Sequence, residues 1–287
     1  MPYPLINIPF HYMKAYVCSH NGMGDNIIMI GAIHYLLQFY EHVYFICKDR
    51  YYPNIKLLFN ESDNVTCIPY DHAKGEHAEI RRILYGAYQS SADTFICGPA
   101  HVGHIPSRIT CPAFLEAVTP CNRNYTIDCD YINARDYNFI ERFYKDMRLN
   151  LTVYYDYFRL PITEESVALY ETVKDYYIIF IQLKSSDGFR LNIESVLEKY
   201  LHDPRAIIIC NDNNLYDEGE HPIKYSLAQK FVYNKIVNYN VVILGSDEIY
   251  VIDSCFIGIL LPYMKTGKLR ANTVKIVPRA AAAGTVL

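Results

Sequence analysis

The chain lacks any apolar run long enough to span a bilayer. Of its 287 residues 51% are hydrophobic and 20% are charged, but no stretch approaches the roughly 18 consecutive apolar residues of a transmembrane helix. No N-terminal segment combines a basic start with an apolar core of signal-peptide length. We therefore expect a cytoplasmic protein without a transmembrane segment.

Paired cysteines and an excess of positive charge are also lacking. None of the nine cysteines belongs to a C-x-x-C pair. Cys18, Cys47, Cys97 and Cys210 lie in apolar, strand-like runs, which indicates buried thiols in a reducing compartment. The net charge of -4 leaves no electrostatic footprint for nucleic acid, so we expect no nucleic-acid partner. The G-x-S-x-G motif of the usual hydrolase elbow does not occur.

Patterns for metal binding are sparse. His101 and His104 are three residues apart, but no third ligand is spaced to complete a zinc site. A loop role or a substrate contact is the better interpretation of this pair. The only D-x-D triplet, Asp128-Cys129-Asp130, does not follow an obvious strand and stays a minor alternative metal site. We predict no metal and no cofactor.

The chain does contain a regular alternation of strand-like and helix-like segments. Its length favours two domains, and we place the boundary in the tyrosine-rich connection LNLTVYYDYFRLPIT, which gives residues 1–155 and 156–287. The rhythm predicts an α/β fold with two Rossmann-like, doubly wound parallel sheets facing a cleft. Helices are expected near residues 26–40, 54–59, 76–88, 134–147, 192–201 and 225–236. The expected strands are 16–19, 42–48, 65–70, 93–98, 176–183, 206–211, 240–246, 249–256 and 273–278.

A glycine-rich loop joins the first strand to the first helix. Gly22 and Gly24 permit a tight turn with close backbone approach, and a helix N-terminus that follows such a turn favours anions. Ile27 stands where the third glycine of a dinucleotide fingerprint belongs, which argues against NAD or FAD. Asp25 follows the second glycine. Its carboxylate either has a chemical role or merely caps the helix, and the spacing favours neither.

Two polar turns follow apolar strands in the second half. Lys184, Ser185, Ser186 and Asp187 come directly after YYIIFIQL, where ligands of open α/β sheets bind. An amine and two hydroxyls at this position suit a diphosphate, whereas a solvated loop with a helix cap is the alternative. Further along the chain, Asp253, Ser254 and Cys255 follow the apolar IYVI, and a helix cap would also explain them.

Together these segments resemble the GT-B glycosyltransferases. The likeness rests on GMGDN near residue 24, the loop at Lys184 and the segment DSCFIG from Asp253. It is greatest toward the ADP-heptose:lipopolysaccharide heptosyltransferase group and its relatives in large DNA viruses. Members of that group are metal-independent, inverting enzymes that bind a nucleotide sugar mainly through the C-terminal domain and the acceptor through the N-terminal domain. Cys255 and Gly258 replace the group's Gly and His, so heptose as the donor sugar is unsupported.

The resemblance implies a hexosyl-, deoxyhexosyl- or heptosyltransferase that uses a nucleoside-diphosphate sugar and a glycan acceptor. Asp25 matches the catalytic base, and Asn26, His101 and His104 are expected to contact the acceptor. A non-catalytic nucleotide- or sugar-binding protein, or a Rossmann-type oxidoreductase or methyltransferase, are the alternatives. The residues expected to bind the donor are Gly22, Gly24, Lys184, Ser185, Ser186, Asp253, Ser254 and Cys255.

Overall fold

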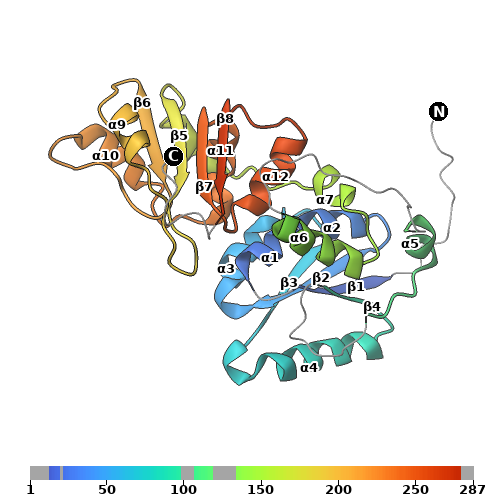
Figure 1. Cartoon of the computed structure of the whole chain (residues 1–287). Coiled ribbons are helices and arrows are strands. Elements are labelled where there is room, and N and C mark those ends of the chain that lie inside the picture. The colour runs from blue at the N-terminus through green and yellow to red at the C-terminus, as the bar shows by residue number, and fades with distance from the viewer. Residues whose placement is uncertain (1–12, 20–21, 98–106, 119–133, 279–287) are drawn as a thin grey trace, which may run out of the picture.

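The computed structural model describes residues 13–19, 22–97, 107–118 and 134–278. It contains two parallel four-stranded sheets, one from each half of the chain (Figure 1). The order of the first sheet is β3-β2-β1-β4 and that of the second is β6-β5-β7-β8. Their strands are β1 (Lys14–Cys18), β2 (His42–Lys48), β3 (Val65–Tyr70), β4 (Asp93–Ile96), β5 (Tyr177–Gln182), β6 (Ala206–Cys210), β7 (Glu248–Ile252) and β8 (Thr273–Val277).

Helices connect the parallel strands. In the first half they are α1 (Met23–Ile28), α2 (Ile30–Leu36), α3 (Tyr52–Ile55), α4 (Glu76–Gln89), α5 (Pro112–Ala117), α6 (Ala134–Asp146) and α7 (Thr152–Asp156). In the second half they are α8 (Glu164–Glu171), α9 (Glu194–Tyr200), α10 (Pro222–Gln229), α11 (Asn240–Gly245) and α12 (Ile257–Lys265). Among the described residues, no helix has the length and apolar character needed to cross a membrane.

The strand order of each sheet reverses beside its first strand. In the first sheet β1 lies between β2 and β4, and in the second β5 lies between β6 and β7. Ligands of such sheets bind outside the carboxyl ends of the strands at this reversal. The loops after β1, β5 and β7 are therefore the places where the topology favours a site.

The expected strands are confirmed except for one. Residues 240–246, NVVILGS, form helix α11 instead, with Asn240, Val242 and Ile243 buried. A short apolar run rich in Val and Ile does not distinguish a buried strand from a buried helix. Here tertiary packing decides, because Asn240 accepts a 2.6 Å hydrogen bond from the hydroxyl of Tyr263, and Gly245 leaves room for the ring of Tyr170.

The tyrosine-rich segment 149–163 is not the polar connection that we expected. It contains the buried helix α7, whose Tyr154 is fully buried. The Tyr154 hydroxyl donates a 2.8 Å hydrogen bond to the carbonyl oxygen of Gly258 at the start of α12. A Cβ atom at Gly31 in α2 would lie only 2.8 Å from the carbonyl oxygen of Val153. Helix α7 thus packs against helices from both halves, and the division into domains at residues 155 and 156 stays a prediction.

Candidate active site

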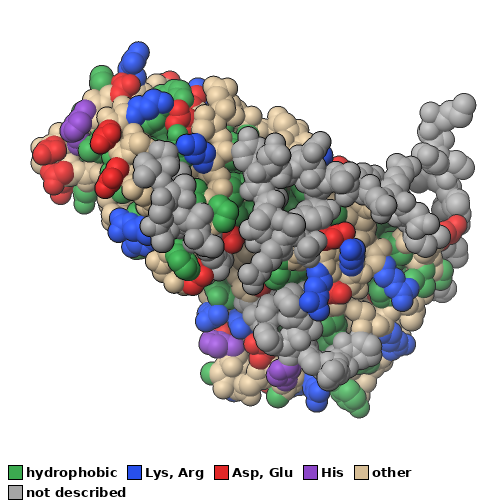
Figure 2. All heavy atoms as spheres, in the orientation of Figure 1, with side chains coloured by type: hydrophobic (Ala, Val, Ile, Leu, Met, Phe, Trp, Pro, Cys, Tyr) green, Lys and Arg blue, Asp and Glu red, His purple; other side chains and the backbone are tan. Residues whose placement is uncertain are grey.

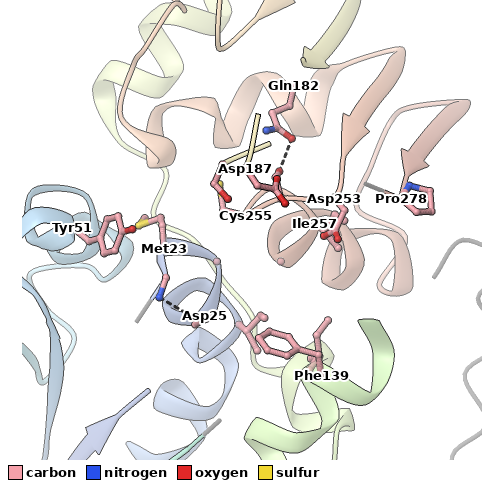
Figure 3. A pocket seen from close by; sticks show the side chains of 17 residues that line it. Met23, Asp25, Tyr51, Phe139, Gln182, Asp187, Asp253, Cys255, Ile257 and Pro278 are labelled. Atoms are coloured by element: carbon pink, nitrogen blue, oxygen red, sulfur yellow. Dashed lines mark hydrogen bonds between the residues drawn. The ribbon is translucent and has the colours of Figure 1, made fainter. Parts of the chain in front are cut away.

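A cavity of about 800 Å³ lies between the carboxyl ends of the two sheets (Figure 3). The first half contributes residues from the glycine turn, α1, the turn after β2 and α6. The second half contributes the ends of β5 and β7, the hairpin loop after β5 and the start of α12. The described lining residues are Gly22, Met23, Gly24, Asp25, Ile28, Tyr51, Phe139, Ile140, Gln182, Ser186, Asp187, Asp253, Ser254, Cys255, Ile257, Gly258 and Pro278.

The glycine turn is held together by hydrogen bonds from the first turn of α1. The backbone N–H of Gly22 donates a 2.8 Å bond to Oδ2 of Asp25. Nδ2 of Asn26 donates a 2.6 Å bond to the carbonyl oxygen of Gly22, and the Ser19 hydroxyl donates to Oδ1 of Asn26 at 3.2 Å. Asn26 is only 2% exposed, so the structure places it in the support of the turn rather than in the cavity lining.

Asp25 both caps the helix and faces the cavity. Its Oδ2 accepts the Gly22 bond, as expected of an acid in the first turn of a helix. Among the described residues, no hydrogen bond to its other oxygen, Oδ1, is present. A Cβ atom at position 22 would lie 3.0 Å from Oδ2 of Asp25, so the absence of a side chain at Gly22 permits this close bond. One carboxylate oxygen is thus engaged and the other is available for a ligand.

The loop after β5 forms a small hairpin. The backbone N–H groups of Leu183 and Lys184 both donate to Oδ2 of Asp212, at 2.8 and 2.9 Å. The Ser185 hydroxyl donates to Oδ1 of Asp187 at 2.5 Å. Ser186 and Asp187 line the cavity, whereas Ser185 is buried beneath the loop. The Lys184 side chain is exposed and is not part of the lining.

The turn between β7 and α12 forms the opposite wall. The Ser254 hydroxyl donates a 2.5 Å hydrogen bond to Oε1 of Gln182 and accepts one of 3.2 Å from the backbone N–H of Phe256. Gln182 also donates through Nε2 to the carbonyl oxygen of Lys184. Burial raises the pKa of the Cys255 thiol to about 12, so this group is protonated near neutral pH and is a poor nucleophile.

Two glycines allow the halves to approach closely at the cavity. A Cβ atom at Gly24 would lie 3.4 Å from Cα of Cys255. A Cβ atom at Gly258 would lie 3.0 Å from Cγ2 of Ile27, which is tighter than ordinary packing. A side chain at position 258 would therefore have to displace the side chain of Ile27.

The structure brings most of the sequence-predicted site residues together. Seven of them line the cavity, namely Gly22, Gly24, Asp25, Ser186, Asp253, Ser254 and Cys255. Lys184 and Ser185 lie beside it, in the hairpin. His101, His104, Asp128 and Asp130 fall outside the described residues. The sequence reasoning missed Gln182, although a polar residue that ends the apolar run YYIIFIQ was a usable signal, and it missed the aromatic residues Tyr51 and Phe139.

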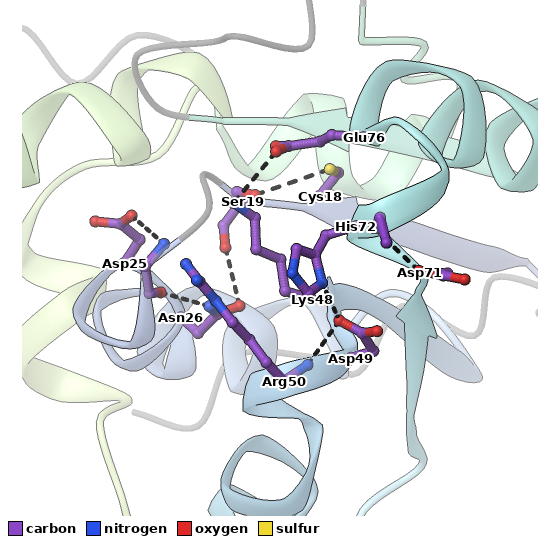
Figure 4. A network of polar contacts seen from close by, with 12 residues as sticks. Cys18, Ser19, Asp25, Asn26, Lys48, Asp49, Arg50, Asp71, His72 and Glu76 are labelled. Atoms are coloured by element: carbon purple, nitrogen blue, oxygen red, sulfur yellow. Dashed lines mark hydrogen bonds and ion pairs between the residues drawn. The ribbon is translucent and has the colours of Figure 1, made fainter.

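A separate polar network lies at the carboxyl ends of β2 and β3 (Figure 4). Lys48 forms a 3.2 Å ion pair with Glu76, and Nδ1 of His72 lies 2.6 Å from Oδ1 of Asp49. Hydrogen bonding from His72 lowers the pKa of the Asp49 carboxyl. Ligand atoms of Asp49, Asp71 and His72 lie within 4.8 Å of one another, the closest approach to a metal-ligand set among the described residues.

The charged side chains described in the cavity lining are acidic, although the Arg50 guanidinium packs on the ring of the lining residue Tyr51. Among the described lining residues the charged ones are Asp25, Asp187 and Asp253. The acidic loop after β6 has Asp217, Glu218 and Glu220 exposed. Figure 2 shows Asp and Glu side chains gathered at the end of the molecule that carries α10, while Lys and Arg side chains are scattered over both halves.

Comparison with known proteins identifies a similar fold. No family model matches the chain, and no curated protein sequence matches it. Among solved structures, a glycosyl transferase family 9 protein from Veillonella parvula superposes with a TM-score of 0.52 at 13% identity, covering 94% of this chain and 88% of that one. The ADP-heptose lps heptosyltransferase II of E. coli gives a TM-score of 0.49 at 13% identity over 85% of this chain and 80% of that one. At this identity the first likeness establishes the fold alone.

Proposed function

We propose that the protein is a glycosyltransferase that moves a sugar from a nucleoside-diphosphate sugar to a hydroxyl group of a glycan or glycoconjugate. The observation that carries this proposal is the cavity position of Asp25. Asp25 lines a space that is also lined by the hydroxyl-bearing turn at Ser254, and its Oδ2 is held by the Gly22 N–H. The fold shared with a glycosyl transferase family 9 protein supports the same reaction class.

Asp25 would act as the general base of an inverting displacement. The acceptor oxygen attacks the anomeric carbon on the face opposite the diphosphate and passes its proton to Oδ1 of Asp25. The bond between the anomeric carbon and the diphosphate oxygen breaks, and its electron pair leaves with the nucleoside diphosphate. The Gly22 bond to Oδ2 orients the carboxylate, so that Oδ1 stays directed at the acceptor.

The second half of the chain would hold the donor. Ile257 and Gly258, the first residues of α12, line the cavity, so the positive end of that helix borders the space available to a diphosphate. Ser186 adds a hydroxyl group that can donate to the diphosphate, whereas Ser254, whose hydroxyl donates to Gln182, would contact the donor as a hydrogen-bond acceptor. Lys184, on an exposed and flexible stem at the base of the hairpin, would reach the diphosphate when the donor is bound. This scheme requires no metal ion. Residues 156–287 would bind the donor, and residues 1–155 would bind the acceptor.

The hydrogen bond between Asp25 and Gly22 also supports a second candidate, a non-catalytic nucleotide- or sugar-binding protein in which Asp25 only caps α1. An oxidoreductase is less compatible, because the position of the missing third glycine is filled by Ile27, which is fully buried in the core.

A ligand screen followed by a transfer assay tests the proposal. Thermal shift with UDP-, GDP-, ADP- and CMP-linked sugars, beside NAD and S-adenosylmethionine, should single out one nucleotide sugar. A ligand at about 100 times its dissociation constant stabilises the folded state by roughly 2.7 kcal/mol. The selected donor is then incubated with a glycan library and products are read by mass spectrometry. Binding without any transfer or donor hydrolysis would favour the non-catalytic candidate, and stabilisation by NAD or S-adenosylmethionine alone would refute both.

A further inference from the structure

One wall of the cavity is aromatic and apolar. Met23 at the start of α1, Tyr51 after β2 and Phe139 of α6 come from three separate elements and line the same space as Asp25 (Figure 3). Ile28 and Ile140 complete this wall, which comes entirely from the first half of the chain. Opposite it lie the polar groups of β5 and β7. The first half thus contributes mainly apolar groups and one carboxylate, and the second half contributes most of the polar groups together with the apolar Ile257 and Pro278.

Phe139 is unusual because a large apolar side chain is left 38% exposed at a cavity. Its ring packs edge-on against the ring of Phe143, with centroids 5.2 Å apart and planes at 70°. Phe143 is fully buried, so it anchors Phe139 from the core side. Tyr51 is also supported, since the guanidinium carbon of Arg50 lies 4.6 Å from the centroid of its ring. Each of the two aromatic rings thus packs against a neighbouring side chain in the absence of a ligand.

The charge of the lining restricts what this wall can bind. On the side of the first half, Asp25 is the charged group among the described lining residues, and an anionic group placed against its carboxylate would be repelled in a partly desolvated cavity. A phosphorylated or carboxylated ligand on the side of Asp25 would face this repulsion. An uncharged sugar ring would not. One of its faces presents C–H groups that pack on an aromatic ring, and its rim presents hydroxyl groups that donate to a carboxylate.

We propose that Phe139, Tyr51 and Met23 form the acceptor subsite, and that it selects an uncharged sugar ring. This inference rests on the proposed function, because it assigns Asp25 to the acceptor hydroxyl. The ring packs its C–H face on Phe139, and the hydroxyl that will be glycosylated donates its proton toward Oδ1 of Asp25. Phe139 is a specificity-determining residue in this arrangement, and the donor lies on the far side of the cavity.

The test compares the acceptor KM with the donor KM of transfer in the same variants. Methyl glycosides of glucose, galactose and mannose serve as uncharged acceptors, and the corresponding 6-phosphates serve as charged ones. Phe139→Ala should raise the acceptor KM about tenfold or more, and Phe139→Tyr should restore it. The donor KM should stay within about twofold of wild type in both variants, because the donor does not touch this wall. Tyr85→Ala is the control, since Tyr85 on α4 is 65% exposed and is not part of the lining.

Three results would overturn the inference. The first is a raised donor KM with an unchanged acceptor KM in Phe139→Ala, which would make the wall a nucleobase platform. The second is preferential transfer to the 6-phosphates, and the third is an unchanged acceptor KM in both variants. If the wild-type protein neither hydrolyses nor transfers any nucleotide sugar, the proposed function fails. Saturation-transfer NMR with the methyl glycosides then decides the subsite separately, because their binding must still be lost in Phe139→Ala and kept in Tyr85→Ala.

Discussion

The hydroxyl of Ser254 lies 2.5 Å from Oε1 of Gln182 and donates a hydrogen bond to it. The bond joins the turn after β7 to the end of β5, two strands that are neighbours in the second sheet. Because Gln182 also donates to the carbonyl oxygen of Lys184, one buried amide fixes both polar turns of the proposed donor wall. Gln182 is 4% exposed and acts as a positioning residue for groups that would contact the donor.

Replacement of this amide should loosen the donor wall. Gln182→Met keeps the length of the side chain but leaves the Lys184 carbonyl and the Ser254 hydroxyl without their partner, at a cost of about 1 to 3 kcal/mol in the free energy of unfolding. We expect the donor KM to rise while the acceptor KM stays unchanged. Chemical denaturation and steady-state kinetics measure the two effects. Gln38→Met, at an exposed position, is the control. An unchanged donor KM in a destabilised Gln182→Met protein would limit the role of Gln182 to folding.

Asp25→Asn separates the catalytic from the capping role of this residue. The amide oxygen of Asn still accepts the bond from the Gly22 N–H, so the free energy of unfolding should fall by no more than about 1 kcal/mol. Loss of a general base should lower kcat by about 10² to 10⁴-fold. Thermal denaturation and single-turnover transfer give these two quantities, with Glu218→Gln in the exposed acidic loop as a charge-matched control. A variant that is less stable yet fully active would establish that Asp25 only caps α1.

The sequence predicted the sheets better than it predicted the cavity. Strands 176–183 and 206–211 were located to within one residue at each end, because strands of a covered parallel sheet appear as uninterrupted apolar runs. Helix α11 was misassigned, because the four apolar residues VVIL fit either period. Phe139 carries no local signal, since its position in the cavity wall depends on how α6 packs against the core through Phe143. Contacts of this kind join distant segments, and no pattern within one segment encodes them.

Transfer should persist in excess chelator. In the proposed mechanism the N-terminus of α12, hydroxyl groups and Lys184 stabilise the negative charge of the diphosphate. The mechanism uses no divalent cation. Activity is compared after dialysis against EDTA and after addition of Mg²⁺ or Mn²⁺. Activity that vanishes with EDTA and returns with a metal ion would contradict the mechanism. Asp49→Asn together with His72→Ala then tests the ligand group at the ends of β2 and β3, and the residues Asp128 and Asp130 become the next candidates.

Lys184→Ala should weaken the binding of the nucleoside diphosphate. A hydrogen bond to a charged group contributes about 1.5 to 3 kcal/mol, so the dissociation constant measured by calorimetry should rise at least about tenfold, with little change in affinity for the acceptor. Lys174→Ala is the matched control, because Lys174 is an exposed lysine whose 2.6 Å ion pair with Glu171 lies outside the cavity. Equal affinities of the Lys184→Ala and wild-type proteins would mean that Lys184 does not contact the donor. The diphosphate would then be bound by α12 and the hydroxyl groups alone.

His34 should make the stability of the folded protein depend on pH, through a group that has no part in the proposed catalysis. This residue of α2 is 4% exposed, and its Nε2 lies 3.5 Å from Oδ2 of Asp63. Burial lowers the pKa of its imidazole to about 4, and the positive charge of Arg159 acts in the same direction. The carboxylate of Asp63 raises the pKa, but by less than burial lowers it. His34 is therefore neutral in the folded protein at any pH well above 4.

The free energy of unfolding should decrease as the pH falls from about 6.5 toward 4. The unfolded chain protonates His34 below about pH 6.5, whereas the folded chain resists protonation, so unfolding takes up a proton in this window. The contribution of His34 to the free energy of unfolding is complete above pH 6.5, and about 3 kcal/mol of it is lost by pH 4. Urea denaturation at half-unit pH intervals measures the slope of the free energy of unfolding against pH. His34→Gln should flatten it by as much as one proton, whereas His77→Gln, at an exposed position of α4, should leave it unchanged. Equal slopes in the wild type and His34→Gln would mean that the buried imidazole takes up its proton without unfolding.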